Sequence, residues 1–294
     1  MDIISMRDLD KKTINAIFER AEKIEKSQYR ERKAILATAF FEASTRTKLS
    51  FQSAAQRMGM KVIDFSPEIS SLAKGENFSD TIRMLDIYAD IIVIRHRRDG
   101  SAKLAAKLAE HPVINGGDGA NEHPTQALTD IYTIKKEKGK IAGLNITLFG
   151  DLKHARTMHS LLYGLAMFGA NLTLIAPKGL EPNVEIINEI KSKFKTKIIE
   201  KNDPNFSNAD VIYVVRVQEE RFADKYEAKK IKEQFKLELS DLKTAKNDVI
   251  VLHPLPKIDE ICNDIDKSGY ARYFQQAANA VPIRMAILEY CLLF

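Results

Sequence analysis

The sequence predicts an α/β protein of two lobes, each a parallel sheet flanked by helices, with the lobes joined by bridging helices. Its 294 residues exceed what one hydrophobic core usually supports, so two domains are expected. Short apolar, β-branched runs alternate with helical patterns along the chain, which is typical of parallel α/β sheets. Hydrophobic residues make up 45% and charged residues 29%, as in an ordinary globular protein.

The expected strands form two sets. In the first half of the chain they cover residues 34–41, 61–65, 91–95 and 113–115. In the second half they cover residues 145–149, 171–175, 197–199, 211–214 and 249–252. Ligands of such open sheets bind beyond the carboxyl ends of the strands, so the residues that follow each strand are the first candidates for a site.

Three predicted helices complete the outline. One covers 47–58, directly after the first strand. Residues 130–138 are predicted to be the exposed end of a long helix that Gly139 terminates. The apolar stretch 282–293 is expected to be helical and to pack back on the first lobe. The predicted domains are therefore residues 1–137 plus 279–294, and residues 138–278.

Composition excludes several classes of protein. No apolar run reaches the roughly 18 residues of a membrane span, and the N-terminus lacks the layout of a signal peptide. Cys262 and Cys291 are the only cysteines, so we expect no disulfide framework, no metal site and a cytoplasmic protein. The net charge is +5, yet basic and acidic residues are mixed and Trp is absent, which argues against nucleic-acid binding.

The segment Ser44-Thr45-Arg46-Thr47 follows the first strong strand and opens a helix. A helix N-terminus offers unpaired N–H groups and about half a positive charge, which together attract an anion. Three hydroxyls and a guanidinium add donors that suit a phosphate. A plain Ser or Thr cap is the alternative, but a cap needs one hydroxyl and no arginine. Taken alone, the segment leaves both interpretations open.

Two further strand ends favour the phosphate. The run 91–94 ends in Arg95, followed by His96 and two more arginines. The strand at Val113 leads through a glycine-rich loop into His123-Pro124-Thr125-Gln126, where Pro124 suits a first helical position. His123 and Gln126 would share one face of the first helical turn. Cationic and polar groups therefore gather at neighbouring strand ends.

The second half carries its own strand-end groups. After 145–149 comes Gly150-Asp151-Leu152, which lacks the Gly-x-Gly-x-x-Gly turn of a dinucleotide site, so no cofactor is expected. The strand that begins at Val211 ends in Arg216-Val217-Gln218, and the last strand in His253-Pro254-Leu255-Pro256. The latter is a stiff turn whose carbonyls could face a ligand. No catalytic triad, P-loop or metal spacing occurs, so the chemistry implied is electrostatic.

Four motifs in order resemble the aspartate/ornithine carbamoyltransferases, and the resemblance extends from the first helix to 282–286: Phe41–Thr47, Arg95-His96, His123–Gln126 and His253–Pro256. The loop 70–76 looks like the mobile loop of the aspartate branch, and Arg216-Val217-Gln218 like its aspartate-binding motif, with Arg156-Thr157 as partner. Ornithine enzymes usually carry Cys where Pro254 stands. Lys74, Arg156 and Arg216 would also repel a cationic ornithine side chain and hold two carboxylates. Another amine acceptor, such as ornithine, remains the alternative.

The resemblance implies transfer of a carbamoyl group from carbamoyl phosphate to L-aspartate, in a homotrimer with shared active sites. It implies these catalytic residues: Arg46, Thr47, Lys74, Arg95 and His123. It assigns carbamoyl phosphate binding to Ser44, Thr45, Arg46, Thr47, Ser70, Lys74, Arg95, His123, Gln126, Pro254 and Leu255. It assigns aspartate binding to Lys74, Arg156, Arg216, Gln218 and Leu255. Many relatives add a zinc-bearing regulatory chain, which would dock at 108–112, and the sequence leaves this open.

Small departures from the family pattern are Arg97 after Arg-His, Glu122 where Gln is common, and Lys153-His154-Ala155 before Arg156. They remove no contact residue but change local charge. Glu42, beside the phosphate turn, could brace a closed state by pairing with Arg156 or Arg221, or it could be a plain surface acid.

Overall fold

The computed structural model describes residues 1–218, 231 and 235–293. The chain divides into two compact units, which we call unit 1 (Met1–Thr129 with Asn279–Phe294) and unit 2 (Asp130–Ala278). Each unit carries one all-parallel sheet with helices around it, as the sequence predicted. No helix of the described residues is long and apolar enough to cross a bilayer.

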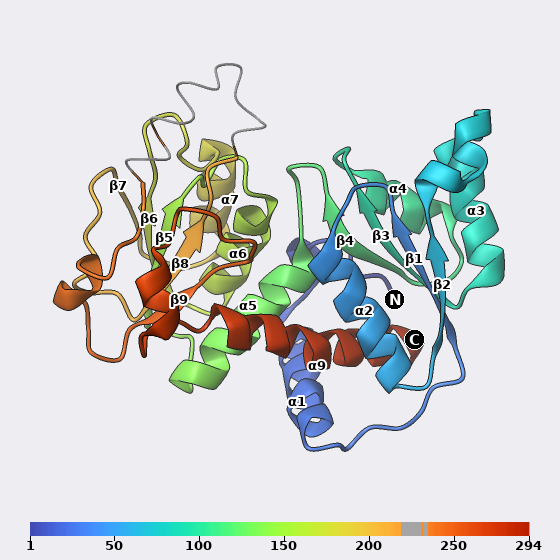
Figure 1. Cartoon of the computed structure of the whole chain (residues 1–294), viewed down its shortest axis with the longest axis horizontal. Coiled ribbons are helices and arrows are strands. Elements are labelled where there is room, and N and C mark those ends of the chain that lie inside the picture. The colour runs from blue at the N-terminus through green and yellow to red at the C-terminus, as the bar shows by residue number, and fades with distance from the viewer. Residues whose placement is uncertain (219–230, 232–234, 294) are drawn as a thin grey trace. The chain divides into compact units, whose positions relative to one another are not determined.

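Unit 1 is built on four strands in the order β2-β1-β3-β4: β1 (Ile35–Phe40), β2 (Lys61–Phe65), β3 (Ile91–His96) and β4 (Val113–Asp118). Its helices are α1 (Lys11–Glu25), α2 (Thr45–Arg57), α3 (Phe78–Tyr88) and α4 (Ser101–Leu108). Three short 3-10 helices are η1 (Met6–Asp8), η2 (Pro67–Ile69) and η3 (Ser71–Lys74). All strand pairs are parallel, so their carboxyl ends share one edge (Figure 1).

The period of two along β1 decides which helix covers which face of this sheet. Ala37 and Ala39 belong to a buried cluster with Ile82 of α3 and Ala102 of α4. Thr38 points to the other face, where its hydroxyl accepts a hydrogen bond from Gln52 of α2 at 3.2 Å. The small residues of β1 thus face α3 and α4, and Thr38 links the strand to α2 on the other face.

Strand β4 is longer than the sequence suggested, because it continues through the glycine-rich segment that we expected to be a loop. Asn115 is the reason: its side chain donates to the carbonyl of Ile4 at 2.9 Å and accepts from the N–H of Gly117 at 2.8 Å. Gly116 also suits this position, because a Cβ there would lie 3.2 Å from the carbonyl of Ile94, which is a tight contact. The side chain of Asn115 therefore replaces ladder partners, and the strand persists.

Unit 2 has five strands in the order β7-β6-β5-β8-β9: β5 (Asn145–Gly150), β6 (Asn171–Ile175), β7 (Ile198–Lys201), β8 (Val211–Val215) and β9 (Ile250–Leu252). Its helices are α6 (Arg156–Met167) and α7 (Val184–Lys193), with 3-10 helices η5 (Asp241–Thr244) and η6 (Asn263–Lys267). One core cluster lies on the face that carries Phe149, Ile212 and Val214.

Two helices contain the boundaries between the units. These are α5 (Pro124–Lys138), which begins at the proline predicted to start it, and α9 (Tyr273–Leu292), which contains Pro282. The expectation that Asp130 begins an exposed helix end was wrong, since Asp130 is 0% exposed. A charged residue in a helical sequence suggests solvent, but its partners in unit 2 bury it.

Strand order marks one point in each sheet where the chain changes direction. In unit 1 the chain runs from β1 outward to β2, then returns to the other side with β3. In unit 2 it runs from β5 to β6 and β7, then returns with β8. The loops after β1 and β3, and after β5 and β8, therefore diverge at the carboxyl edge, where ligands of such sheets usually bind. Those loops carry several of the segments that the sequence singled out, while His123–Gln126 follows β4 and His253–Pro256 follows β9.

Candidate active site

The turn Ser44–Thr47 is the first turn of α2, which begins at Thr45, two residues before the predicted start. Ser44 occupies the N-cap position, but its side chain makes no capping hydrogen bond. The N–H groups of Thr45, Arg46 and Thr47 have no carbonyl of the helix within reach. The structure thus removes the plain-cap interpretation of Ser44 and keeps the donors of an anion site.

Side chains of α2 and α9 hold the backbone of this turn through hydrogen bonds. The hydroxyl of Ser50 donates to the carbonyls of Arg46 and Thr47, the latter at 3.0 Å. Arg284 of α9, 2% exposed, donates to the same hydroxyl and lies over the ring of Phe51 at 5.0 Å. A buried guanidinium behind the turn adds positive charge to the helix N-terminus. The surrounding protein also partly desolvates Arg46 and lowers its pKa, although arginine keeps its charge at neutral pH.

Arg95 reaches the carboxyl edge from β3. Its Nη1 donates to the carbonyl of Gly116 at 3.2 Å, and its Nε lies 3.3 Å from Oε2 of Glu42. The position of a Cβ on Gly116 would lie 3.6 Å from Cγ2 of Thr47, which is 5% exposed. The ends of β1, β3 and β4 therefore converge, as predicted from the sequence. Glu42 pairs with Arg95 in this structure, while Arg221 lies outside the described residues.

His96, next to Arg95, is a structural residue. Its ring packs against Phe41 and Phe78 at 5.2 and 5.4 Å, and its Nδ1 lies 2.9 Å from the N–H of Arg98. Burial lowers the pKa of His96, and the charges of Arg98 and Arg97 lower it further. The ring is thus neutral at pH 7 and accepts the backbone hydrogen bond that shapes the end of β3.

His123 lies just before α5 and is 4% exposed. Its carbonyl accepts from the N–H groups of Gln126 and Ala127 at 3.1 and 3.2 Å, so it acts as the cap residue of the helix. The neighbouring Glu122 accepts from Ser5 at 2.9 Å and pairs with Arg7. The departure from Gln at position 122 is therefore matched by a cation within the same unit.

The 3-10 helix η3 covers Ser71–Lys74, with Ser70 as its N-cap and Gly75, whose φ is 95°, as its C-cap. The Ser70 hydroxyl caps the segment by accepting from the N–H of Leu72 at 3.3 Å and donating to the carbonyl of Pro67. Lys74 is exposed, and its ammonium has no hydrogen-bond or ion-pair partner among the described residues. We call the turn Ser44–Thr47 the anion turn. No hydrogen bond or ion pair joins Lys74 to it within the described residues of one chain.

In unit 2, Asp151 joins the loops after β5 and β8. This carboxylate is 0% exposed; it accepts from the N–H of His154 at 3.0 Å and from the N–H of Gln218 at 3.2 Å. Gly150 permits the close approach, because a Cβ there would lie 2.0 Å from the carbonyl of Val215. Sequence reasoning did not assign Asp151, although an acid directly after a buried strand was the available signal.

The two arginines predicted to bind carboxylates lie on the segments after β5 and β8, which Asp151 connects. Arg156 is the first residue of α6, where the helix N-terminus itself favours an anion. Arg216 follows β8 directly and is partly exposed. Both lie beside the direction change between β5 and β8, which places two guanidinium groups on the edge where a ligand of this sheet is expected.

The turn His253–Pro256 follows β9, and both of its N–H groups donate to other groups of the protein. The N–H of His253 donates to Oε1 of Gln276 at 2.9 Å, and that of Leu255 donates to Nδ1 of His253 at 2.8 Å. Pro254 and Pro256 have no N–H. Because Nδ1 accepts, the ring proton is on Nε2, 2.8 Å from Oε1 of the buried Glu260. The backbone of this turn can therefore offer a ligand only carbonyl oxygens, which accept from an amide or amino group. We call His253–Pro256 the acceptor-only turn.

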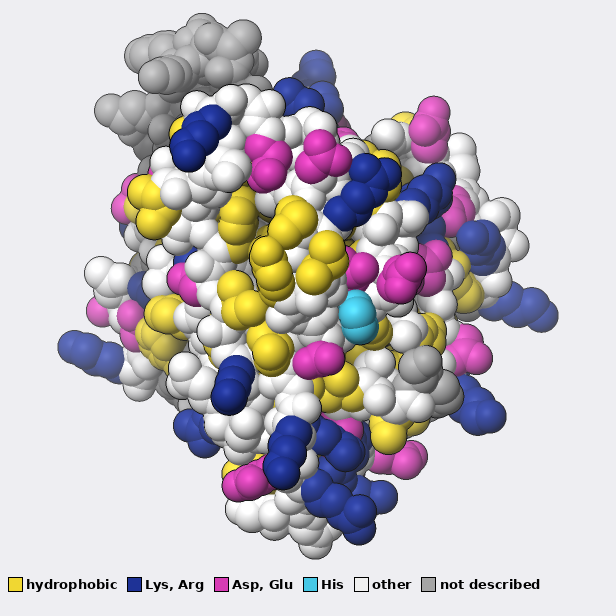
Figure 2. All heavy atoms as spheres, turned by 90° about the vertical axis from the view of Figure 1, so that its right-hand side faces the viewer, with side chains coloured by type: hydrophobic (Ala, Val, Ile, Leu, Met, Phe, Trp, Pro, Cys, Tyr) yellow, Lys and Arg dark blue, Asp and Glu magenta, His cyan; other side chains and the backbone are white. Residues whose placement is uncertain are grey.

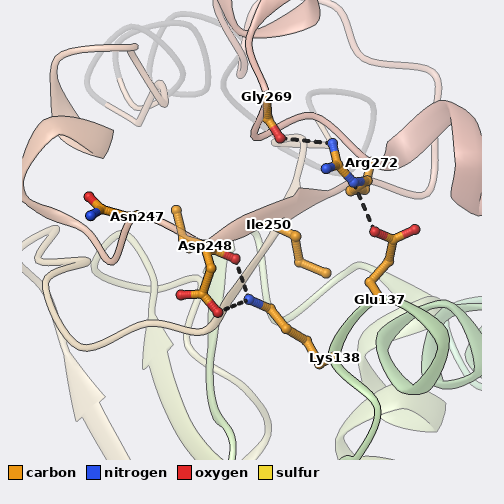
Figure 3. Close-up of a pocket in the computed structure, with 8 residues that line it drawn as sticks. Glu137, Lys138, Asn247, Asp248, Ile250, Gly269 and Arg272 are labelled. Carbon is orange, nitrogen blue, oxygen red and sulfur yellow. Dashed lines mark hydrogen bonds and ion pairs between the residues drawn. The ribbon is translucent and has the colours of Figure 1, made fainter.

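A cavity of about 350 Å³ lies at the opposite, amino edge of the unit 2 sheet (Figure 3). Lys138 donates to the carbonyl of Asp248 and pairs with its carboxylate at 2.9 Å. Arg272 pairs with Glu137 at 2.9 Å and donates to the carbonyl of Gly269 at 2.8 Å. Each cation of this pocket already has a carboxylate, so we do not assign a substrate to it.

Comparison with known proteins agrees with these features. Residues 1–136 match the family model "Aspartate/ornithine carbamoyltransferase, carbamoyl-P binding domain", and residues 142–291 match "Aspartate/ornithine carbamoyltransferase, Asp/Orn binding domain". The aspartate carbamoyltransferase catalytic subunit of Pyrobaculum islandicum is 52% identical over 98% of this chain and 96% of its own length. That of Archaeoglobus fulgidus is 46% identical over 98% and 97%.

Solved structures give the same result. The catalytic subunit of M. jannaschii aspartate transcarbamoylase superposes with a TM-score of 0.91 at 42% identity, over 99% of this chain and 98% of that one. Aspartate transcarbamoylase from Trypanosoma cruzi, in complex with carbamoyl phosphate and aspartate, gives 0.92 at 35%, over 98% and 95%. These relatives favour the aspartate branch over the ornithine alternative. The anion turn, the acceptor-only turn and both halves of the fold thus agree that the chain belongs to the aspartate/ornithine carbamoyltransferase family.

Proposed function

We propose that this chain transfers the carbamoyl group of carbamoyl phosphate to the amino group of L-aspartate, and that unit 1 binds the phosphate. The observation that carries the proposal is the first turn of α2, where Ser44 leaves its hydroxyl uncommitted to capping and Arg46 stands in the first turn. Thr45, Thr47 and Arg95 complete the donors. Thr47, Arg95 and His123 would hold the carbamoyl oxygen, and Gln126 the amide nitrogen.

Unit 2 would supply the other polar contacts. The carbonyls of Pro254 and Leu255 accept from the amide group of carbamoyl phosphate, which fits a turn with no outward N–H. Arg156, Arg216 and Gln218 bind the carboxylates of aspartate. A planar guanidinium matches a carboxylate through two parallel hydrogen bonds, so two arginines suit a dicarboxylic substrate better than a cationic one.

The reaction then needs no protein nucleophile. The amino group of aspartate attacks the carbonyl carbon, the bond to the phosphate oxygen breaks, and phosphate leaves and can take the amine proton. Charge builds on the carbonyl oxygen in the tetrahedral intermediate, where each preorganised donor is worth about 3–4 kcal/mol. Holding two substrates in reacting geometry supplies about 7–11 kcal/mol more.

Lys74 and Ser70 are proposed to act in a neighbouring copy of the chain, in a homotrimer with shared sites. Lys74 is exposed and has no hydrogen-bond or ion-pair partner among the described residues of its own chain, which supports this assignment. Unit 1 also exposes large apolar side chains on and near α3, with Ile69 88%, Ile87 71% and Tyr88 54% exposed. Figure 2 views this side of the molecule and shows hydrophobic side chains gathered in a patch that a second copy would cover.

Other parts of the expectation stay predictions: a role in pyrimidine biosynthesis, a cytoplasmic location and the domain boundaries 1–137 plus 279–294 and 138–278. A zinc-bearing regulatory chain at 108–112 is a further one. In that segment His111 donates its N–H to Asp86 of α3 at 3.0 Å, and its side chain is 46% exposed. Gel filtration with and without such a chain would test the docking.

The proposed function is tested by calorimetric titration with a bisubstrate analogue that joins a phosphonate to aspartate. We expect tight binding that is lost in Arg46→Ala and weakened in Arg216→Ala. Assay of aspartate and ornithine in parallel with carbamoyl phosphate decides the acceptor. A preference for ornithine would overturn the roles of Arg216 and Gln218.

A further inference from the structure

Unit 2 contains a buried carboxylate that the proposed mechanism does not use. Asp130 of α5 is 0% exposed. It accepts from the hydroxyl of Tyr213 at 2.7 Å and from Nε2 of Gln276 at 2.6 Å. Tyr213 belongs to β8 and is 0% exposed, and Gln276 belongs to α9 and is 1% exposed. A polar cluster this deep is costly unless every member is satisfied.

One arm of the cluster leads to the acceptor-only turn. The N–H of His253 can only donate, so the amide oxygen of Gln276 must face it, at 2.9 Å. The amide nitrogen of Gln276 must then face Asp130, which accepts. Each hydrogen bond of this arm therefore has one possible direction: the backbone N–H of His253 donates to Gln276, and Gln276 donates to Asp130. The next residues, Pro254 and Leu255, carry the carbonyls proposed to bind the substrate amide.

The other arm leads to the carboxylate-binding residues. Tyr213 is a residue of β8 and lies three positions before Arg216, which follows that strand. Thr157, the neighbour of Arg156 at the start of α6, lies near enough to the Tyr213 hydroxyl to act on its pKa. Burial, then the charge of Asp130, raises the pKa of Tyr213 well above its ordinary value, so the phenol stays a donor to Asp130 at working pH. One carboxylate therefore joins the three elements of unit 2 that are proposed to hold substrate.

We propose that Asp130 is a positioning residue: by accepting from Tyr213 and Gln276 it fixes the acceptor turn after β9 and the two arginine-bearing elements in their working geometry. This inference rests on the proposed function, because it concerns the residues that would bind aspartate and the carbamoyl amide. Asp130 itself touches no substrate. Misplacement of a reacting group by about 1 Å can cost about 100-fold in rate, which sets the expected scale.

The test compares Asp130→Leu with Asp130→Asn. The leucine has a similar volume and accepts nothing, so we expect kcat to fall about 100-fold. The asparagine keeps one oxygen for Gln276 and should recover most of that loss. The dissociation constant for inorganic phosphate, proposed to bind unit 1, should stay within about twofold of wild type in both variants. Full turnover in Asp130→Leu would refute the role, as would equal losses in both variants.

A second variant covers a failure of Asp130→Leu to fold. Gln276→Met keeps the shape of the side chain but leaves the N–H of His253 without an acceptor, so it should lower kcat to a similar extent. Ile131→Ala is the matched control: Ile131 is the next residue of α5 and 0% exposed, so its truncation destabilises the fold without touching the cluster. If Ile131→Ala lowered kcat as much at the same loss of thermal stability, the effect would be structural and the inference wrong. An inactive wild type would instead refute the proposed function.

Discussion

Two groups of cationic side chains in this protein differ in how their charge is balanced. In the pocket of unit 2, Lys138 meets Asp248 and Arg272 meets Glu137, and both pairs are 2.9 Å apart (Figure 3). At the anion turn of unit 1, no carboxylate of the described residues pairs with Arg46. A count of basic residues does not separate these regions, because both are rich in cations. The charge balance does separate them: the paired cations of the pocket brace the fold, whereas an unmatched cation at a helix N-terminus, such as Arg46, fits the proposed anion site.

The largest expected effect comes from removing the unmatched cation. Arg46→Ala deletes a guanidinium from the anion turn, and we expect kcat/KM for carbamoyl phosphate to fall about 1000-fold, since such donors act on the developing charge. Steady-state kinetics measures this. Arg97→Ala is the control, because Arg97 is exposed and lies only two residues from Arg95. A comparable loss in Arg97→Ala would mean that general charge, rather than the turn, binds the substrate.

A mixing experiment sharpens the comparison by asking whether the site is complete in one chain. Lys74→Ala and Arg46→Ala should each be inactive alone. If sites are shared around a trimer, random exchange gives hybrids with one intact site in three, and about a quarter of wild-type activity overall. Activity after verified subunit exchange is the measurement. No recovery would mean that Lys74 serves its own chain.

Removing an ion pair from the pocket of unit 2 should lower the stability of the fold and leave kcat unchanged. Arg272→Met removes the pair with Glu137 and the hydrogen bonds to the carbonyls of Gly269 and Ala271. We expect a loss of about 1–2 kcal/mol in the free energy of unfolding, and a melting temperature lower by a few degrees. Calorimetry and kinetics on the same sample test both. A tenfold fall in kcat would show that this pocket supports the reaction.

The smallest effect concerns pH. The pKa of His96 is lowered in the folded protein, chiefly by burial and then by Arg98 and Arg97, from an ordinary value of 6.5. Between the folded and unfolded pKa values the unfolded chain binds more protons, so stability rises with pH across this window and is complete above about 6.5. Acidification below that value should lower the melting temperature more in wild type than in His96→Gln. Parallel curves would contradict the neutral state of His96.

The sequence predicted most of the fold because strands buried on both faces carry a strong, local signal. All nine strands of the described chain occur near their expected positions, and β2 and β6 begin and end at the predicted residues. Helix α2 began two residues early, since a cap is defined by backbone angles that composition does not encode. Strand β4 ran past its predicted end because Asn115 supplies hydrogen bonds that no propensity reveals.

The sequence could propose the residues that would face a ligand, but not the residues that support them. The sequence selected Arg46, Arg95 and Arg216 as candidates because they lie at or shortly after strand ends, where position alone suggests function. Asp151 and Asp130 could not, because their roles depend on partners far away in the sequence: Gln218 for one, Tyr213 and Gln276 for the other. A buried acid looks like a surface acid until the packing is known.

The turn after β9 has one more consequence. Its two prolines and two internally bonded N–H groups leave only carbonyl oxygens for a ligand. An acyl phosphate with a methyl group in place of the amide, such as acetyl phosphate, would leave those oxygens without a donor and away from water. Sites built to hydrogen-bond a group reject analogues that lack it far better than apolar pockets reject a change in size. The turn would therefore act as a chemical filter, one that separates carbamoyl from acetyl donors of nearly the same shape.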